Sequence, residues 1–484
     1  MNDSPTGQRE IPRQRRKRIW LTLIGIVLAG IGLTVGAYFY SAHEAEKRLA
    51  AAIAATDLLD PYWRFEDLEA HREIVPDDSN GALVASVAAQ LMPAGWLNFN
   101  AKPLLQDREP HTACQLNEEQ ANVLRAKLKE AAAAVTKARL LKDLPKGRYA
   151  VAWSEDAIST LLPHLQKTRE LANLLYFDAM LRAHDKDLDG ALESCQAMLN
   201  LSRSIGDEPT YISALVRIAI RAVALGRLEQ VLSQGQASEA ALAALQQAWQ
   251  EEEKFPLLLA ASRGERAFGD RLLVFLQKGR PKNMAAMLGG PNSGMIQTGN
   301  ATLDRLIASV RMGSIPTNRA ALLELHNEII AAVQLPEMER KQHFDDLRAR
   351  REKLPGLAQL LFPTAEKLAE AVARSDAHMR STIAALAAER YRLANGRWPE
   401  SLEALVPRYL KEVPRDPYDG APLRLRRVAD GLVIYSVGVD GKDNGGVLGN
   451  GVAPGTDIGF RLWDVEHRRQ PAPPVKPEEN QEPK

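Results

Sequence analysis

The chain has 484 residues, of which 62 are lysine or arginine and 61 are aspartate or glutamate. This length exceeds the usual size of one hydrophobic core, so we expect two or three domains. The balanced charge argues against nucleic acid as a partner, because nucleic-acid-binding domains carry a strongly basic face. Cys114 and Cys195 are too few for a disulfide framework or a thiolate zinc site. We expect two unpaired thiols, with pairing in an oxidising compartment as the alternative.

A basic tail, residues 1–18, precedes a long apolar stretch. From Ile19 to Tyr40 no side chain is ionisable except the tyrosine phenols at its end. As a helix rising about 1.5 Å per residue, this stretch is roughly 30 Å long, which matches the hydrocarbon core of a bilayer. We therefore predict a transmembrane helix over residues 19–40. A cleaved signal peptide, which has a shorter apolar core, is the alternative.

The distribution of charge around this helix predicts its orientation. Lysine and arginine crowd in front of it, so the positive-inside rule places the N-terminus in the cytoplasm of a single-pass inner (cytoplasmic) membrane protein. Everything after Ser41 then lies outside the cytoplasm. Gly32 and Gly36 are four residues apart, a spacing that allows a second membrane helix to approach closely. A homo-oligomer formed through this face is an option, although glycine is common in membrane helices.

The middle of the chain has helical composition. Residues 41–116 are expected to form a helical stalk, ended by Asp60-Pro61, and a connecting segment. Residues 117–374 are predicted to form a helical domain, because apolar positions recur at intervals of three and four. Turns at 185–190 and 206–209 predict antiparallel helical hairpins. We favour hairpins over a tetratricopeptide array because we find no clean 34-residue period. The stretch 279–316 is rich in Gly, Asn and Met and is expected to be irregular.

Charged residues in this helical domain have plain structural interpretations. The stretch His184–Gly190 resembles the start of a calcium-binding EF-hand loop, but the twelfth position is Gln196, so a helix-to-helix turn is favoured. Arg217, Arg221 and Arg227 can form a basic stripe for an anionic partner. A solvated helix face is the commoner arrangement and is what we expect.

The C-terminal region changes pattern from helix to short strands. A long helix is predicted to end at Asn395-Gly396, followed by a short helix over 402–406. Strand-like segments cover 423–428 and 432–437, with Asp430-Gly431 as a hairpin turn between them. Residues 469–484 are rich in Pro and Glu and are predicted to be disordered. The predicted fold is mainly α, with a membrane helix, a helical-hairpin body and a small C-terminal α+β module.

This module resembles the C-terminal domain of the major pseudopilin of type II secretion systems (protein G). The matching motifs occur in the same order and cover about one fifth of the chain; they lie at 391–399, 402–410, 414–417, 435–441, 457–459 and Trp463. The resemblance implies an α+β module over residues 375–468, whose small sheet ends in a calcium-binding loop. The complete layout resembles single-pass membrane proteins of planctomycete-type bacteria, a resemblance that implies no activity.

In that family the loop binds Ca²⁺ through aspartates and main-chain carbonyls, which implies Asp440, Asp443 and Asp457 as metal ligands here. Calcium prefers six to eight hard oxygen ligands, so carboxylates among glycines suit it. The alternative is that these aspartates only form turns, since Asp-Gly and Asp-Asn-Gly-Gly are turn sequences.

Two departures from the pseudopilin pattern decide the functional expectation. The stretch Arg18–Thr22 lacks the glycine of a pseudopilin processing site, and the apolar helix lacks its glutamate. More than 300 residues also separate the helix from the module, so we do not expect a filament subunit. Without a recognisable catalytic motif, we expect no enzyme. The predicted function is a membrane-anchored, extracytoplasmic structural or protein-interaction protein with unidentified protein partners. The alternatives are an accessory component of a type II secretion or pilus-like system, and an envelope hydrolase.

Overall fold

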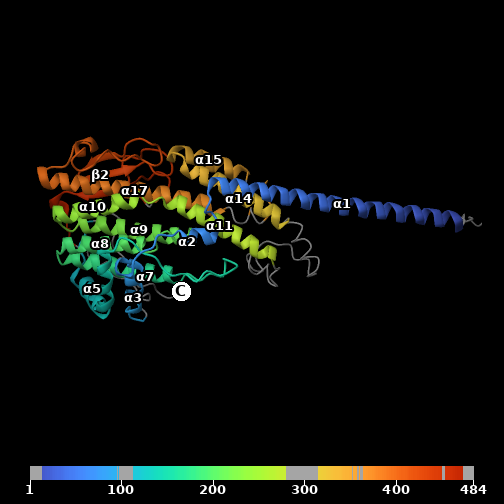
Figure 1. Cartoon of the computed structure of the whole chain (residues 1–484). Helices are drawn as coiled ribbons and strands as arrows, with labels where there is room; N and C mark the ends of the chain where they lie inside the picture. Colours follow the sequence, from blue (N-terminus) through green and yellow to red (C-terminus); the bar gives the residue numbers. More distant parts are fainter. Residues whose placement is uncertain are drawn as a thin grey trace, which may run out of the picture.

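The computed structural model describes residues 13–94, 96, 113–278, 314–350, 353–356, 359, 363–449 and 453–471. Within them the protein is mainly helical, with a long apolar N-terminal helix and a small three-stranded antiparallel sheet near the C-terminus (Figure 1). The predicted fold class is confirmed at this level. The stretch 279–313, for which we expected irregular structure, lies outside the described residues.

The first helix, α1 (Arg13–Leu59), is continuous and projects from the body along half of its length (Figure 1). Residues 20–41 are all exposed, and the helix is long and apolar enough to cross a membrane. Farther along, Leu49 and Ala52 are buried against Ala320 of α14 (Ile315–Gln334). Arg48 of α1 also pairs with Glu324 of α14, with Nε donating at 2.9 Å. The predicted stalk is therefore helical to Leu59 but is fastened to the body.

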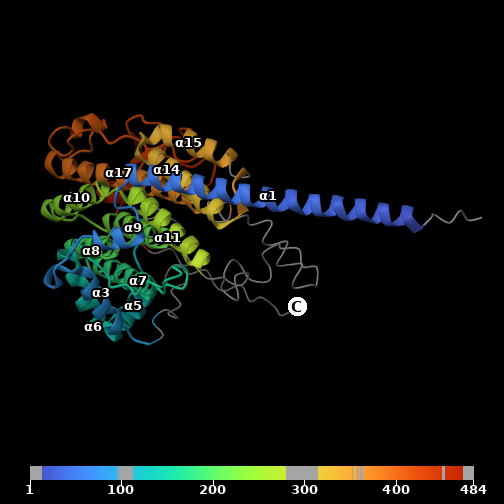
Figure 2. The same ribbon diagram turned by 45° about the vertical axis from the view of Figure 1, so that its right-hand side comes forward.

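The body consists of consecutive helices that fold back on one another (Figure 2). Their bounds are α2 Phe65–Ala70, α3 Gly81–Gln90, α5 Glu118–Glu130, α6 Ala132–Arg139, α7 Pro163–His184, α8 Leu188–Arg203, α9 Tyr211–Leu232, α10 Glu239–Glu253 and α11 Leu257–Lys278. Two 3-10 turns, η1 (Asp77–Ser79) and η3 (Leu140–Asp143), accompany them.

The predicted turns at 185–190 and 206–209 both separate helices. The carboxylate of Asp187 caps α8 by accepting a hydrogen bond from the Gly190 amide at 3.0 Å, which satisfies a free helix-terminal N–H. The hydroxyl of Thr210 caps α9 through the Ser213 amide at 3.1 Å. Successive hairpins begin at Pro163 and Tyr211, a spacing wider than the 34 residues of a tetratricopeptide repeat.

Helical structure is less continuous than the composition suggested. Residues 144–162 form no helix, because Pro145 and Gly147 interrupt the chain after η3. Gly147 also lies directly against the backbone of Ser204, where a Cβ would approach its Cα to 2.6 Å. This segment crosses α8 at a separation that only glycine allows.

Helix α15 (Glu337–Arg350) follows α14, and α17 (Pro363–Asn395) then runs along the body beside α9 and α10. One side of α17 packs on these two helices, and another packs on the sheet. The position 374/375, at which we divide the helical domain from the C-terminal module, falls inside α17. Buried residues of both parts, such as Leu386, Leu228 and Phe460, belong to one hydrophobic core. The module is therefore a layer of the body.

The sheet has the order β1-β2-β3, with strands β1 (Arg424–Val428), β2 (Gly431–Ser436) and β3 (Ile458–Trp463). The β1-β2 hairpin confirms the two predicted strands and the turn at 430–431, and Val428 pairs with Gly431. A Cβ at Gly431 would lie 1.9 Å from the Leu462 carbonyl oxygen, so glycine is required there. The sequence reasoning missed β3. The expected helix over 402–406 is wrong in type, since η6 (Leu402–Leu405) is a 3-10 turn.

The end of the described chain is bound to the body. After the 3-10 turn η7 (Val465–His467), the Arg469 amide donates to the Ser233 carbonyl at 2.9 Å. Gln470 exchanges backbone hydrogen bonds with Ala113 and Gln115, at 2.9 and 2.8 Å. The first residues of the segment predicted to be disordered thus have ordered partners, and 472–484 lie outside the described residues. Cys114 and Cys195 are free thiols.

Candidate functional site

The loop between β2 and β3 holds the three aspartates proposed as metal ligands. It leaves β2 after Ser436 and rejoins the sheet at Ile458, so both ends of the loop are fixed by neighbouring strands. Gly445 and Gly446 follow one another at φ values of +70° and +77°, in the left-handed region that side chains rarely adopt. This backbone directs consecutive amides toward the carboxylates of Asp443 and Asp457.

Asp457 is the buried centre of the loop. Its side chain is fully buried, and its Oδ2 accepts a hydrogen bond from the Gly446 amide at 2.7 Å. Its Oδ1 accepts one from the Asn444 amide at 3.2 Å. Buried polar groups need such partners, because a buried carboxylate without them loses its hydration uncompensated. Asp457 therefore organises the loop backbone.

Asp440 lies on the exposed side of the same loop and faces Asp457 across Asn444. The Gly455 and Lys442 amides each donate to its carboxylate at 3.0 Å. These hydrogen bonds, chiefly that from Gly455, hold the pKa of Asp440 below its ordinary value. The side-chain amide of Asn444 lies 3.4 Å from both the Asp440 and the Asp457 carboxylates. The loop thus brings two of the three predicted aspartates to one point.

Asp443 is directed elsewhere. Its Oδ1 accepts hydrogen bonds from the Gly445 amide at 2.8 Å and the Tyr435 hydroxyl at 3.1 Å, and Arg424 Nε lies 3.3 Å from its Oδ2. The Gly445 amide is the main cause that lowers the pKa of Asp443. Burial, and then the Asp443 carboxylate, raise the pKa of Tyr435 to about 12. An arginine at this distance competes with a cation, so Asp443 is the weakest of the three candidates.

A hard cation fits the Asp440 and Asp457 side of the loop better than the Asp443 side. The Asp440 and Asp457 carboxylates and the amide oxygen of Asn444 are oxygen donors of the type that calcium prefers. An asparagine side chain presents either its oxygen or its NH₂ group after a flip, so the contacts of Asn444 suit both a hydrogen-bond bridge and a ligand. The sequence reasoning did not select Asn444. The sequence feature that could have indicated Asn444 is the Asp-Asn-Gly-Gly turn in which it lies.

A further aspartate, Asp416, holds the start of the loop in position. The sequence reasoning did not select it as a site residue either. It is buried, and it accepts hydrogen bonds from the Ser436 hydroxyl at 2.7 Å and the Val437 amide at 2.8 Å. Arg424 Nη1 donates to Oδ2, which also accepts the bond from the Val437 amide, at 3.1 Å. Asp416 belongs to the motif at 414–417, so the motif connects the segment before the sheet to the start of the loop.

Another group of potential ligands lies after β3. Asp464, Glu466 and His467 offer one ligand atom each within 4.8 Å of one another, which no other trio does among the described residues. However, Asp464 already accepts hydrogen bonds from Trp398 Nε1 at 2.5 Å and Arg427 Nη2 at 2.9 Å. Exposed acidic groups of this kind are common without an ion. We therefore assign no site to them.

The expectation of a solvated arginine face is wrong. Arg217, Arg221 and Arg227 of α9 are all buried. Arg217 and Arg221 converge on Glu252 of α10, with Arg217 Nη2 donating to its carboxylate at 2.8 Å. Arg203 of α8 donates to the same carboxylate at 2.7 Å. Arg217 and Arg221 were misassigned because the glutamate that neutralises them lies on another helix.

The environment of this arginine cluster, defined as Arg203, Arg217 and Arg221 around Glu252, sets the charge of its carboxylate. Burial opposes ionisation of Glu252, but the three guanidinium groups outweigh burial and lower its pKa to about 2. Asp376 of α17 lies near Arg221 and Arg380, and burial raises its pKa to about 7. Arg380 joins α17 to Glu253 of α10 and to Glu337 of α15 at 2.7 and 2.8 Å.

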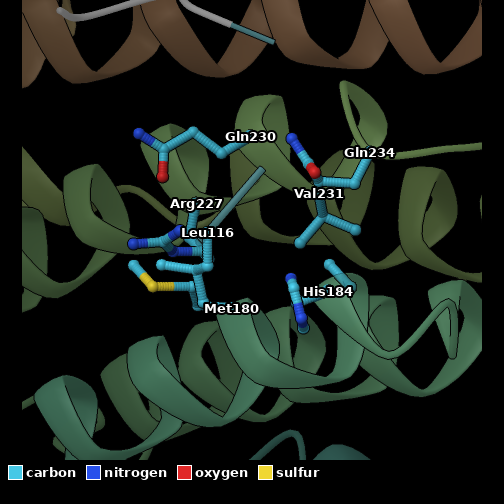
Figure 3. Close-up of a pocket in the computed structure, with 8 residues that line it drawn as sticks. Leu116, Met180, His184, Arg227, Gln230, Val231 and Gln234 are labelled. Carbon is cyan, nitrogen blue, oxygen red and sulfur yellow. The ribbon is translucent and has the colours of Figure 1, made fainter. Parts of the chain in front are cut away.

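Two small cavities lie in the described part of the chain. The one between α7 and α9 has a volume of about 10 Å³, which is room for one water molecule (Figure 3). Its lining residues are Leu116, Met180, Ala183, His184, Arg227, Gln230, Val231 and Gln234. A second cavity of about 10 Å³ adjoins Arg217 and Phe255. Neither accommodates a substrate.

Comparisons of the chain with family models, with curated proteins and with solved structures find no match. The resemblance to the major pseudopilin therefore stays a prediction based on the motifs of the C-terminal module.

Proposed function

We propose that the protein is a single-pass membrane protein whose body serves a structural or protein-interaction role outside the cytoplasm, in the cell envelope. The observation that carries the proposal is that residues 20–41 of α1 are exposed and apolar, while residues from Ala45 onward pack on the body. A long apolar face on a helix is unstable in water and stable in a bilayer. The basic tail before the helix favours a cytoplasmic N-terminus.

The continuous connection between α1 and the body supports an anchor rather than a removable leader. A signal sequence is released, so its helix has no reason to extend into the core of the mature protein. Here Leu49 and Ala52 are buried, and Thr56 donates to the Ala52 carbonyl and accepts from Asn327 of α14, both at 2.8 Å. Cleavage after Tyr40 would leave these contacts in place, so the support for an anchor is that α1 continues unbroken from the apolar stretch to Leu49.

The C-terminal module supports a role in protein contacts. Its order of long helix, 3-10 turn and antiparallel strands is that expected of the pseudopilin-like module, and we propose a Ca²⁺-stabilised loop at Asp440 and Asp457 with Asn444. This order also favours the second candidate function, an accessory component of a type II secretion or pilus-like system. That alternative requires co-assembly with true pseudopilins. The third candidate, an envelope hydrolase, gains no support from the two cavities of about 10 Å³.

The proposed function is tested by fractionation and crosslinking of the full chain. We expect the protein to stay in the membrane pellet after alkaline carbonate extraction, at its full mass of 53.3 kDa. Protease added to spheroplasts should digest the body, which the positive-inside orientation places outside. Recovery of a shorter, soluble protein would show a cleaved leader and overturn the proposal. Crosslinking in intact membranes, with mass spectrometry of the partners, separates the two candidate functions: pseudopilins among the partners favour the accessory component.

A further inference from the structure

The two helix ends nearest the projecting part of α1 define one end of the body. Helix α11 ends at Lys278 and α14 begins at Ile315, and both ends point along α1 in the direction in which it leaves the body (Figures 1 and 2). Phe275 and Ile315 pack with Leu276 and Leu322 in one small hydrophobic cluster. We refer to Phe275, Gln277, Lys278 and Ile315 as the proximal end.

The contacts between α1 and α14 fix the height of the proximal end along α1. Leu49 and Ala52 of α1 pack against Ala320 and Leu323 of α14, and Thr56 meets Asn327, so the two helices run in the same direction. Ile315 precedes Ala320 by five residues, which is about 7.5 Å along a helix. The start of α14 therefore lies level with the α1 residues just before Ala45, the first buried residue of α1.

The same spacing gives the distance from the proximal end to the predicted hydrocarbon core. The apolar stretch ends at Tyr40, four or five residues before the level of Ile315, which corresponds to about 7 Å of helix. The headgroup layer on one side of a bilayer is about 5–8 Å thick, from the difference between total and hydrocarbon thickness. Any tilt of α1 shortens this height further. The proximal end therefore falls within the headgroup layer.

No hinge in α1 allows the proximal end to move away from the headgroup layer. Between Ser41 and Leu59 the helix contains neither proline nor glycine, the usual causes of a kink. Its junction with the body is also held at the far end, where Asp60 accepts hydrogen bonds from Arg263 at 2.6 and 2.7 Å and from Arg266. A body fixed in this way has little freedom to move away from the membrane.

We propose that the proximal end rests on the lipid headgroups of the membrane that α1 crosses, so that the bilayer surface is a second binding partner of the body. This inference rests on the proposed membrane anchoring. It adds that the body is held against the membrane in one orientation, with the α10 and α17 end facing away. Residues 279–313, which join α11 to α14, lie outside the described residues, so the surface is defined by Phe275, Gln277, Lys278 and Ile315 alone.

The experiment uses the full chain in liposomes that contain phosphatidylcholine with a spin label on its headgroup. Cys114→Ser removes the partly exposed thiol, while Cys195 is fully buried and unreactive to a probe. A fluorescent label is then attached at Gln277→Cys or, as control, at Arg397→Cys, which directly follows α17 at the opposite end of the body (Figure 1). We expect the label at 277 to be quenched several-fold more than the label at 397.

A second variant tests the distance between the proximal end and the membrane. Seven helix-forming residues inserted between Ser41 and Ala42 lengthen α1 by about 10 Å. They also turn the body about the α1 axis by nearly two complete turns, so the body keeps almost the same rotational orientation relative to the membrane helix. Quenching at 277 should then fall to the level at 397. Equal quenching at both positions in the chain without the insertion would overturn the proposal, while flotation with the liposomes would preserve membrane anchoring. A chain that does not float with the liposomes would overturn both.

Discussion

Arg217 of α9 binds both carboxylate oxygens of Glu252 of α10, with its Nη2 at 2.8 and 3.0 Å from them. Both side chains are buried, and Arg203 and Arg221 share the same carboxylate. Three positive charges therefore depend on one negative charge in the interior of the helical body. Helices α8, α9 and α10 meet at this carboxylate, so Glu252 holds these three helices together through its ion pairs.

Substitution of Glu252 should be strongly destabilising. Glu252→Gln leaves three buried guanidinium groups without a counter-charge, and removal of one partner from a buried ion pair costs about 3–5 kcal/mol. Urea unfolding followed by circular dichroism would measure the loss. The matched control is Glu251→Gln, because Glu251 is exposed and its ion-pair partner within the described residues is Lys254, at 2.7 Å; its expected cost is about 0–1 kcal/mol. Similar costs for the two variants would refute the role of Glu252.

The ionisation of Asp376 predicts a pH dependence of stability. Its pKa is about 7 in the folded protein against an ordinary value of 3.8. The folded state therefore holds the proton more tightly, so the associated stability is full below about pH 4 and is lost as the pH rises through 7. Asp376→Asn removes this dependence and should be more stable relative to the unsubstituted chain at pH 8 than at pH 5, by about 1.4 kcal/mol for each pH unit between 5 and 7.

Thermal unfolding at a series of pH values between 5 and 8 would measure the effect of Asp376→Asn. Asp345→Asn is the control, because Asp345 is a partly exposed residue of α15 that pairs with Arg348 at 3.3 Å. It should leave the pH profile unchanged. If the difference between Asp376→Asn and the unsubstituted chain is constant over this range, Asp376 does not titrate near neutrality.

Calcium should raise the melting temperature of the protein if the loop binds it. A ligand that binds only the folded state stabilises it by about 2.7 kcal/mol at one hundred times its dissociation constant. We expect a shift upward in Ca²⁺ relative to EGTA that is absent in Asp440→Asn, whose carboxylate is exposed enough for the fold to tolerate the change. Glu466→Gln, in the exposed acidic group after β3, should keep the full shift. A shift lost in Glu466→Gln and kept in Asp440→Asn would move the site to that group.

Asp60 should control the rigidity of the junction between α1 and the body. Asp60 directly follows α1, and its carboxylate accepts hydrogen bonds from Arg263 and Arg266 of α11. Asp60→Asn weakens these charge-assisted hydrogen bonds, and we expect cleavage of residues 41–59 by a limiting amount of trypsin to become several-fold faster. Asp57→Asn is the control, because Asp57 is partly exposed and its side-chain partners among the described residues are Trp63 and Arg64, close to it along the chain. Unchanged cleavage in Asp60→Asn would show that α1 is held by its apolar contacts alone.

Features that depend on residues close in the sequence could be predicted from the sequence. The end of α1 before Asp60-Pro61, the turns after His184 and Arg203, and the β1-β2 hairpin follow from local chemistry: proline cannot continue a helix, Asp187 caps the next one, and Asp430-Gly431 forms a tight turn. The apolar stretch of α1 could likewise be recognised from consecutive residues. Asp440 and Asp457 could be selected as candidates because their loop resembles the calcium-binding loop of the major pseudopilin.

Features that depend on distant partners were decided only by the tertiary structure. The sequence does not show that Glu252 meets Arg217, since a charge on a helix looks the same whether water or a buried counter-ion faces it. Strand β3 has no alternating pattern, because both of its faces are covered. Asp443 turned toward Arg424, a residue of another strand, while Asn444 took the place between Asp440 and Asp457. Local chemistry determined where the helices begin and end, and long-range packing determined which charges are buried.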